Sequence, residues 1–309
     1  MAVSAPDGAS PRGGERLELA SARVPFRLKV ALVWVVLFII AAAFFAAAGF
    51  DTAWMRTNLP FIAAGLRYTL TIALAGIILA IVLAVLGALG RLSSNAIAYG
   101  LSGFYVSFFR GTPLIVQMFL IYLAMPQVAR GLSDREGFPS ISGEFADVFI
   151  LDAAIAGTLA LGLNYGAYMT EIFRAGIQSV NSGQGEAADA LGMTHARKMR
   201  IVVLPQALRV VIPPTGNEFI AMMKDTALVS FLGVTVASAE IFRRSQLVGK
   251  AELKNLEAYL LAAALYWLLT AVFSFFQARL ERRISSGYDR SATARSRRGG
   301  NHAVLEEPA

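Results

Sequence analysis

The sequence predicts an all-α integral membrane protein with about six transmembrane helices. Of its 309 residues, 56% are hydrophobic and only 16% are charged, and the mean hydropathy is +0.57. A soluble domain of this size carries about 25% charged residues. Several apolar runs approach the ~20 residues that a helix needs to cross a bilayer. These runs are continuous, and they lack the alternating segments of roughly ten residues that are typical of a transmembrane β-barrel.

Six apolar segments are the predicted transmembrane helices. Basic residues gather before the first segment, between the fourth and the fifth, and after the last. Because Lys and Arg concentrate on the cytoplasmic side of membrane proteins, both termini are expected to be cytoplasmic. The region before the last segment also contains basic residues, so it departs from this rule. The predicted spans are residues 30–50, 61–90, 97–125, 149–173, 201–223 and 256–280.

The two ends of the chain differ in composition from its centre. Residues 1–28 are rich in Ala, Ser, Pro, Gly and Arg without an apolar period, which predicts a disordered cytoplasmic tail. This long polar lead is not typical of a signal peptide. Residues 29–60 are predicted as an N-terminal span and an outer loop, and residues 61–282 as the main transmembrane domain. Residues 283–309 are predicted as a basic cytoplasmic tail.

The composition also argues against several classes of function. The chain has no cysteine, so it has no thiolate nucleophile and no cysteine metal site. The two histidines, His195 and His302, are far apart in polar segments, and no metal site or other cofactor is expected. An intramembrane enzyme would need paired acids, a Ser–His pair or a metal box within the spans, so no catalytic residue is assigned. The net charge of +7 is attributed to cytoplasmic Lys and Arg rather than to nucleic-acid binding.

The third predicted span contains a predicted helix break. Arg110, Gly111, Thr112 and Pro113 lie inside an apolar segment, where such residues are costly unless they face protein or a water-filled cavity. Two interpretations stay open, namely a broken helix that lines a pathway and an interfacial kink from which Arg110 reaches the surface. Prolines are also predicted to kink or interrupt the fifth span, at Pro205, Pro213 and Pro214.

The polar stretch at residues 184–214 connects a water-facing surface to a membrane span. It contains the run EAADAL, whose residues favour a helix, with Glu186 and Asp189 expected in the first turn, where negative charge suits the helix dipole. Gly192 follows where a left-handed C-cap residue would lie, and Thr194 can cap the next helix. The stretch therefore predicts a short helix, a sharp turn and a second helix that enters the membrane. The alternative is a plain polar loop.

This stretch resembles the EAA motif of ABC importer permeases, and its surroundings resemble the polar amino acid permease family. The resemblance covers about residues 61–280 and departs from the usual pattern only mildly, at Thr170 and Ala227. The motif residues are Glu186-Ala187-Ala188, Gly192 and Leu204-Pro205-Gln206-Ala207; the others are Phe109-Arg110-Gly111-Thr112-Pro113-Leu114, Gln117, Tyr168, Glu171, Arg174-Ala175-Gly176-Ile177, Gly183-Gln184 and Lys224-Asp225-Thr226.

The resemblance implies a type I ABC importer permease core, to which the first helix is an extra N-terminal addition. It further implies the transmembrane subunit of an ATP-driven, binding-protein-dependent importer of polar L-amino acids in a bacterial inner membrane, working by alternating access. The chain has no G-x-x-x-x-G-K-[ST] motif, so ATP hydrolysis belongs to a partner. The implied partners are two copies of a cytoplasmic ABC ATPase, an extracytoplasmic solute-binding protein and a second permease subunit, either a copy or a similar chain.

The resemblance also implies roles for individual residues. The residues expected to couple to the ATPase are Glu186, Ala187, Ala188, Asp189, Leu191, Gly192 and Met193. Polar residues near mid-membrane are candidates for the substrate pathway, or else they make hydrogen bonds between helices; they are Asn164, Tyr168, Asn217 and Glu218. Structural ion pairing is expected for the charged residues nearer the helix ends, which are Arg110, Glu171, Arg174, Lys224 and Asp225.

Three alternative functions stay open at this point. The first is a related ABC permease that carries an opine or another amino-acid derivative. The second is a secondary transporter driven by protons or sodium, although no internal repeat supports the inverted-repeat design. The third is the intramembrane enzyme, which lacks a suitable set of residues. Which amino acid is transported, and whether the pore is a homodimer, does not follow from the sequence.

Overall fold

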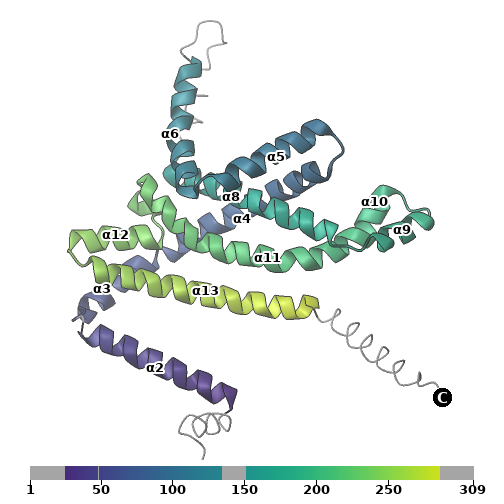
Figure 1. The fold of residues 1–309 in the computed structure, drawn as a ribbon. Coiled ribbons are helices and arrows are strands. Elements are labelled where there is room, and N and C mark those ends of the chain that lie inside the picture. Colours follow the sequence, from purple (N-terminus) through teal and green to yellow (C-terminus); the bar gives the residue numbers. More distant parts are fainter. Residues whose placement is uncertain (1–24, 48, 134–150, 286–309) are drawn as a thin grey trace, which may run out of the picture. The chain divides into compact units, whose positions relative to one another are not determined.

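The computed structural model describes residues 25–47, 49–133 and 151–285, and every regular element in these ranges is a helix. The predicted all-α class is therefore confirmed (Figure 1). The chain forms two units, Met1–Trp54 and Met55–Ala309, which are described separately. The two predicted tails fall largely outside the described residues.

The first unit contains α2 (Phe26–Ala47), which corresponds to the predicted N-terminal span. The backbone N–H of Trp54 donates a hydrogen bond of 2.9 Å to Oδ1 of Asp51. A carboxylate at this position caps a helix, and α3 (Thr52–Ala63) begins directly after it. Helix α3 covers most of the predicted outer loop, so this segment is helical, because Asp51 starts a helix.

The second unit is a helical bundle with short helices at its two ends. The α9–α10 pair lies at one end and α12 lies at the other (Figure 1). The helices of this unit, besides the rest of α3, are α4 (Leu66–Leu92), α5 (Ala96–Gly111), α6 (Leu114–Ser133), α8 (Ala153–Gln178), α9 (Ser182–Ala190), α10 (His195–Lys198), α11 (Leu204–Asp225), α12 (Ile241–Ala251) and α13 (Asn255–Ser285), with a π-helical turn at Met199–Val203 and 3-10 segments at Thr226–Leu232 and Val236–Ser238.

Helices α4 and α8 form the centre of this bundle, and small residues bring them together. A Cβ atom on Gly162 would lie 2.5 Å from Leu79 Cδ2, and one on Gly166 would lie 2.9 Å from Leu83 Cβ. Neither position has room for a side chain. Membrane helices associate largely through such close packing, because lipid provides no hydrophobic drive between them.

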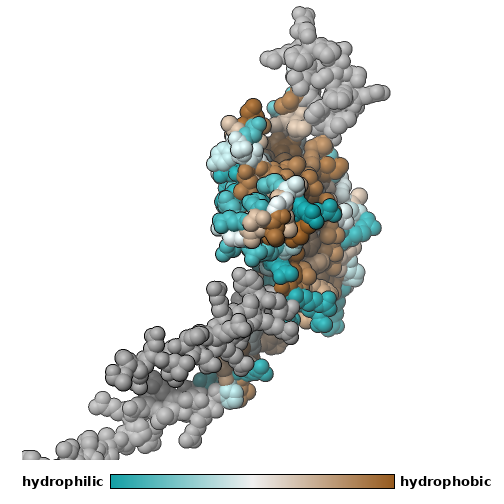
Figure 2. Space-filling model, turned by 90° about the vertical axis from the view of Figure 1, so that its right-hand side faces the viewer, coloured by the Kyte–Doolittle hydropathy of each residue, from teal (hydrophilic) through white to brown (hydrophobic). Residues whose placement is uncertain are grey.

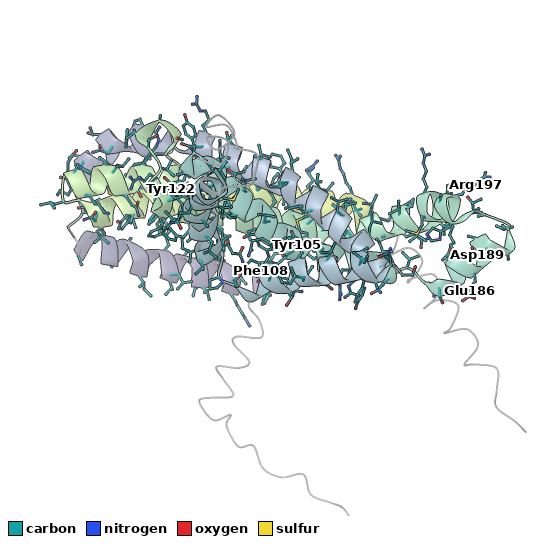
Figure 3. All side chains as sticks on the ribbon, turned by 90° about the horizontal axis from the view of Figure 1, so that it is seen from above. Tyr105, Phe108, Tyr122, Glu186, Asp189 and Arg197 are labelled. Atoms are coloured by element: carbon teal, nitrogen blue, oxygen red, sulfur yellow. The ribbon has the colours of Figure 1, made fainter. Side chains whose placement is uncertain are left out.

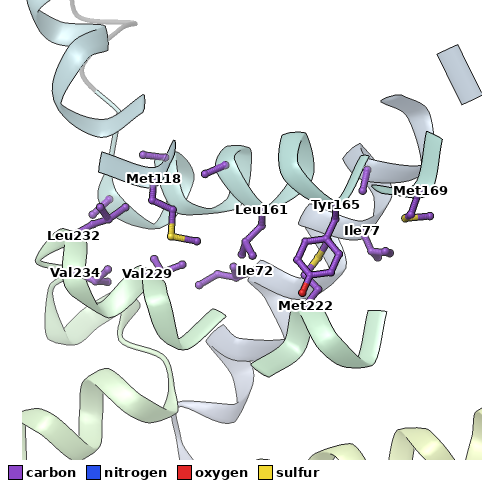
Figure 4. Packing of buried hydrophobic residues seen from close by; sticks show 14 of the residues in the cluster. Ile72, Ile77, Met118, Leu161, Tyr165, Met169, Met222, Val229, Leu232 and Val234 are labelled. Atoms are coloured by element: carbon purple, nitrogen blue, oxygen red, sulfur yellow. The ribbon is translucent and has the colours of Figure 1, made fainter. Parts of the chain in front are cut away.

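The buried core lies between α4, α6, α8, α11 and the 3-10 segment that follows α11 (Figure 4). Side chains from segments far apart in the sequence meet there, and several of them are methionines, whose flexible thioethers fill irregular gaps. The larger members of this core include Ile72, Ile77, Met118, Leu161, Tyr165, Met169, Met222 and Val229.

The described residues contain two helices long and apolar enough to cross a membrane, Thr52–Leu92 and Asn255–Ile284. The pair Ala96–Gly111 and Leu114–Val128, bent by 109°, provides a third if it is one span. On the visible face in Figure 2, hydrophobic residues form continuous areas. Helices α8 and α11 are less apolar, because they contain polar residues such as Asn164 and Glu218. The count of six spans stays a prediction.

Two helices continue through prolines. Helix α6 continues through Pro126 to Ser133, beyond the predicted end of the third span at residue 125, and residues 134–150 lie outside the described residues. Helix α11 continues through Pro213 and Pro214. Near the proline pair, the Thr215 hydroxyl donates to the Val211 carbonyl (2.8 Å), and Gln277 donates to the Pro213 carbonyl (3.0 Å).

The segment between α11 and α13 is anchored by one buried carboxylate. Glu240 is fully buried and accepts hydrogen bonds from the backbone N–H groups of Phe242 and Arg243 and from the Tyr266 hydroxyl, each at 2.6 Å. Burial raises the pKa of the Glu240 carboxyl above its usual range, while these bonds act in the opposite direction. Glu240 thus caps α12 and ties it to α13.

The start of α4 packs directly on this capped turn. A Cβ atom on Gly65 would lie 2.6 Å from the Ile241 nitrogen and 2.7 Å from the Glu240 carbonyl carbon. Because these contacts are backbone atoms, no side-chain rotation can relieve them. The position therefore requires glycine for packing, since its backbone conformation is ordinary.

We predict that Gly65→Ala destabilises the protein by about 1–3 kcal/mol, the range for overpacking a closed contact. Thermal unfolding of the full chain in detergent measures the effect. Gly100→Ala is the matched control, because a Cβ on Gly100 of α5 meets nothing within 4 Å in the described structure. An equal melting temperature for the two variants would contradict the packing described for α4.

Candidate functional site

A cavity of about 360 Å³ lies between the α5–α6 break, α8 and α11. Its only charged lining groups within the described structure are two carboxylates, both from α11. The other polar groups come from the break and from α8. The lining residues are Thr112, Pro113, Leu114, Asn164, Tyr165, Tyr168, Glu218 and Asp225.

The break between α5 and α6 is held by two buried amide side chains. Nε2 of Gln117 lies 2.9 Å from the Phe109 carbonyl, 3.0 Å from the Thr112 carbonyl and 2.7 Å from the Thr112 hydroxyl. Nδ2 of Asn164 donates to the Phe109 carbonyl (2.9 Å) and to Oε1 of Gln117 (3.1 Å). A helix end leaves its last carbonyls without partners, and these amides supply donors where water is excluded. Asn164 thus both lines the cavity and fixes its wall.

The acidic wall of the cavity comes from the last two turns of α11. Glu218 and Asp225 are seven residues apart, which places them on one side of the helix. The Tyr165 hydroxyl donates a hydrogen bond of 2.8 Å to Oδ2 of Asp225. Neither carboxylate has an ion pair in the part of the chain that the structure describes. The cavity therefore offers negative charge to a cationic group.

Arg110 lies near this cavity and contacts the aromatic ring of one of its lining residues, Tyr168. Its guanidinium lies 5.1 Å from the centroid of the Tyr168 ring, within the range of a cation–π contact. Tyr168 lines the cavity, whereas Arg110 does not. Arg110 is exposed and makes no ion pair with another described residue, so the ion pair expected for it stays a prediction.

The predicted pathway residues separate into two groups. Asn164, Tyr168 and Glu218 line the cavity. Asn217 does not, because neighbouring residues on a helix point about 100° apart. Its Oδ1 accepts a hydrogen bond of 2.9 Å from Gln277 of α13, which corresponds to the alternative of a bond between helices.

Sequence reasoning missed Tyr165 and Asp225 as cavity residues. Asp225 was expected in an ion pair, but it accepts from Tyr165 instead. The spacing of seven residues from Glu218 was a signal that could have found it. Ion pairing is confirmed for Glu171, which lies 2.7 Å from Arg174 and 3.5 Å from Arg91.

A second candidate site is the exposed pair α9–α10 at one end of the bundle. Helix α9 begins at Ser182, after Asn181 Oδ1 accepts a hydrogen bond of 2.8 Å from the Gly183 N–H. Glu186 and Asp189 therefore do not lie in its first turn, as had been expected. The capping residue, Asn181, was overlooked because it precedes the alanine-rich run.

The turn after α9 has the predicted conformation. Gly192 has φ +71°, the left-handed region that favours glycine. The Gly192 N–H donates to the Asp189 carbonyl (2.9 Å) and the Met193 N–H donates to the Ala188 carbonyl (3.1 Å). These two bonds form a Schellman motif. Thr194 then caps α10 by accepting a bond of 3.4 Å from the Arg197 N–H.

An ion pair also joins the two short helices, and their outer side chains are exposed to solvent. Nζ of Lys198 lies 2.8 Å and 2.9 Å from the two carboxylate oxygens of Asp189. Ala188 is buried, whereas Leu191 is 77% exposed. Glu186 and Asp189 lie at the extremity of the bundle, far from Tyr122 (Figure 3). This surface is suited to docking by another protein.

The π-helical turn at Met199–Val203 joins α10 to α11 without a loop. Helix α11 then continues to Asp225 in the cavity wall. The exposed surface and the acidic cavity are therefore connected by one nearly continuous helical path.

Comparison with known proteins identifies the relatives of this chain. The model of the family described as "Binding-protein-dependent transport system inner membrane component" matches residues 76–286. The "Probable amino-acid permease protein YxeN" of Bacillus subtilis is 40% identical over 77% of this chain and 97% of its own length. The "Arginine transport system permease protein ArgU" of Corynebacterium glutamicum is 36% identical over 93% of this chain and 89% of its own length. The match to ArgU covers so much of this chain that it includes residues of α2.

A solved structure has the same fold. A chain of the structure entitled "Crystal structure of an amino acid ABC transporter with histidines" has a TM-score of 0.65 to this protein and 35% sequence identity. The similarity covers 76% of this chain and 99% of that one.

We predict that Gln117→Leu destabilises the bundle by about 1–3 kcal/mol, the cost of leaving buried carbonyl groups without donors. Thermal unfolding in detergent measures the loss. Gln178→Leu is the matched control, since Gln178 is exposed, and its effect should remain within about 0.5 kcal/mol. If Gln117→Leu melted with the wild type, the amides would not be holding the α5–α6 break.

Proposed function

Because the chain belongs to the family of binding-protein-dependent transport system inner membrane components, we propose that it is the permease subunit of an ATP-driven importer of polar L-amino acids. As a translocation component it performs no catalysis itself. One observation supports the proposal above the others: helix α11 contributes the two carboxylates of the cavity and is joined directly to the exposed α9–α10 pair. A transporter of this kind needs a connection between the site that binds the solute and the surface on which the ATPase acts.

The cavity chemistry favours a substrate with a cationic group. Every amino acid brings an α-ammonium group, and Glu218 and Asp225 offer it negative charge where water is scarce. The same two carboxylates would repel a second carboxylate on the substrate side chain. Neutral polar and basic amino acids are therefore favoured over acidic ones. The relative ArgU is named for arginine transport, which agrees with this preference.

In the proposed mechanism, a partner ATPase grips residues 186–194. Two ATPase copies close on binding ATP and move α9 and α10 together, because Asp189 and Lys198 join these helices. The π turn passes the displacement to α11, whose far end forms the cavity wall. A shift at one end of a packed helix can select between discrete arrangements of its neighbours, which is the basis of alternating access.

The remaining parts of the complex are also proposals. The α9–α10 end and both termini lie in the cytoplasm, and an extracytoplasmic solute-binding protein delivers the amino acid to the α12 end. A second permease subunit, a copy or a similar chain, completes the pore. A related permease for an amino-acid derivative would use the same design, whereas a secondary transporter would leave the α9–α10 surface without a purpose.

We predict that Gly192→Pro uncouples ATP hydrolysis from transport. Proline fixes φ near −65° and cannot adopt the φ of +71° found here, so the turn between α9 and α10 is lost. The complex with its ATPase and binding protein, reconstituted in liposomes, should import at least about tenfold less amino acid per ATP hydrolysed. Gly185→Ala, whose Cβ would only touch Lys198 Cδ at 4.0 Å, is the control.

Normal coupling in Gly192→Pro would exclude the proposed role of the turn. Uptake that continues without ATP, or that stops when an uncoupler dissipates the ion gradient, would instead support an ion-coupled secondary transporter.

We predict that Glu218→Gln raises the KM for a basic amino acid about tenfold, since a charged partner is replaced by a neutral one of the same shape. Asn217→Ala is a control on the same helix, because Asn217 bonds to α13 and does not line the cavity. The assay is ATP-dependent uptake by proteoliposomes at varied substrate concentration. Unchanged affinity and selectivity in Glu218→Gln would remove Glu218 from the substrate site.

A further inference from the structure

A second cavity, of about 170 Å³, forms a groove between α11 and α13. It lies on the side of α11 opposite to Glu218, as the helical periodicity requires. Its walls are almost entirely apolar and include the rings of Phe219, Phe273 and Phe276. This groove has no part in the transport mechanism described above.

The two helices that form the groove are held at a fixed separation. A Cβ atom on Gly216 would lie 2.9 Å from Gln277 Cδ, so α11 and α13 are in close contact there. The rings of Phe219 and Phe273 meet edge to face, with centroids 5.4 Å apart. Contacts on the groove walls therefore fix its shape within this helix pair.

Polar groups occur at one end of the groove and mostly bond to each other. Nε2 of Gln277 lies within 3.0 Å of the Pro213 carbonyl, of Asn217 Oδ1 and of Glu281 Oε1. The Glu281 carboxylate is thus already engaged, and its charge would repel an anion from this part of the groove.

Arginines extend the groove beyond these polar groups. Arg209 precedes Pro213 by four residues and Ile212 by three, so it lies on the groove face of α11 one turn further along. Its side chain is exposed and has no ion pair or hydrogen bond with the other described residues. On α13, the exposed Arg283 follows Leu280 of the groove by three residues. Positive charge therefore borders an apolar slot.

We propose that the α11–α13 groove binds an acyl chain of an anionic phospholipid from the cytoplasmic leaflet, with the lipid phosphate on Arg209 and Arg283. The leaflet assignment rests on the orientation given in the proposed function. Basic pockets between transmembrane helices on the cytoplasmic side bind anionic headgroups, and a guanidinium pairs with a phosphate through parallel hydrogen bonds.

The surroundings of the groove favour lipid over a protein occupant. Only 17% of the most apolar window of α13 is buried within the described structure, so this helix offers its outer side to hydrocarbon. The groove volume admits a chain of a few methylene groups but no helix. Arg209 has no ionic partner among the described residues and lies beside the apolar groove, which suits a lipid with an apolar chain and an anionic head group.

The test is native mass spectrometry of the assembled transporter, purified with its ATPase and exposed to phosphatidylglycerol or phosphatidylcholine. We expect the wild type to retain phosphatidylglycerol preferentially. Arg209→Ala should lose that preference by about tenfold, equivalent to ~1.4 kcal/mol, whereas Arg209→Lys should keep most of it. Arg282→Ala is the matched control, because Arg282 lies on the opposite side of α13 from the groove.

Several outcomes would overturn the proposal. Retention of the lipid by Arg209→Ala would overturn it. An equal loss of lipid in Arg282→Ala would also overturn it, because this would indicate attraction to general surface charge. The chain has no native cysteine, so Phe276→Cys introduces a single thiol into the groove. A crosslink between two copies through this thiol would make the groove an interface between permeases. Transport activity is measured separately, so a wild-type transporter that imports normally but shows no preference for phosphatidylglycerol would refute only this inference.

Discussion

The central constraint on this structure is that a helix which ends inside an apolar bundle must still satisfy its carbonyl groups. Helix α5 ends at Gly111, and the next helix leaves at 109°. Water is scarce there, so the buried amides of Gln117 and Asn164 donate to the Phe109 and Thr112 carbonyls. The bend opens the space that becomes the cavity. The polar site thus exists because the break is satisfied from α6 and α8.

The features that were predictable from the sequence are those that local residues determine. The turn after α9 follows from Gly192 and Thr194, whose preferences act within a few residues and gave the observed Schellman motif and cap. The start of α9 was misplaced because Asn181 is a good cap whose helix begins with residues of low helix propensity. Apolar length likewise predicted the all-α membrane class.

The composition of the cavity depended on tertiary contacts that the sequence does not display. Asn217 and Glu218 are adjacent and equally polar, but the rotation of α11 directs one to Gln277 and the other to the cavity. Asp225 resembled an ion-pair residue, and only the approach of α8 supplied Tyr165 as its donor. The prolines at 213 and 214 predicted a kink or an interruption, and α11 continues through both without an interruption.

These properties meet in α11, which has two different sides. One side presents Glu218 and Asp225 to the cavity, and the other presents Gly216 and the groove to α13. Two prolines remove backbone donors in the middle of this helix, which makes it easier to bend there than elsewhere. The contact with Gln277 lies at this same place, at the Pro213 carbonyl. In the proposed mechanism, a displacement that enters at α9 would therefore bend α11 at its prolines or shift it along α13, and the proposed lipid in the groove would influence which of the two costs less.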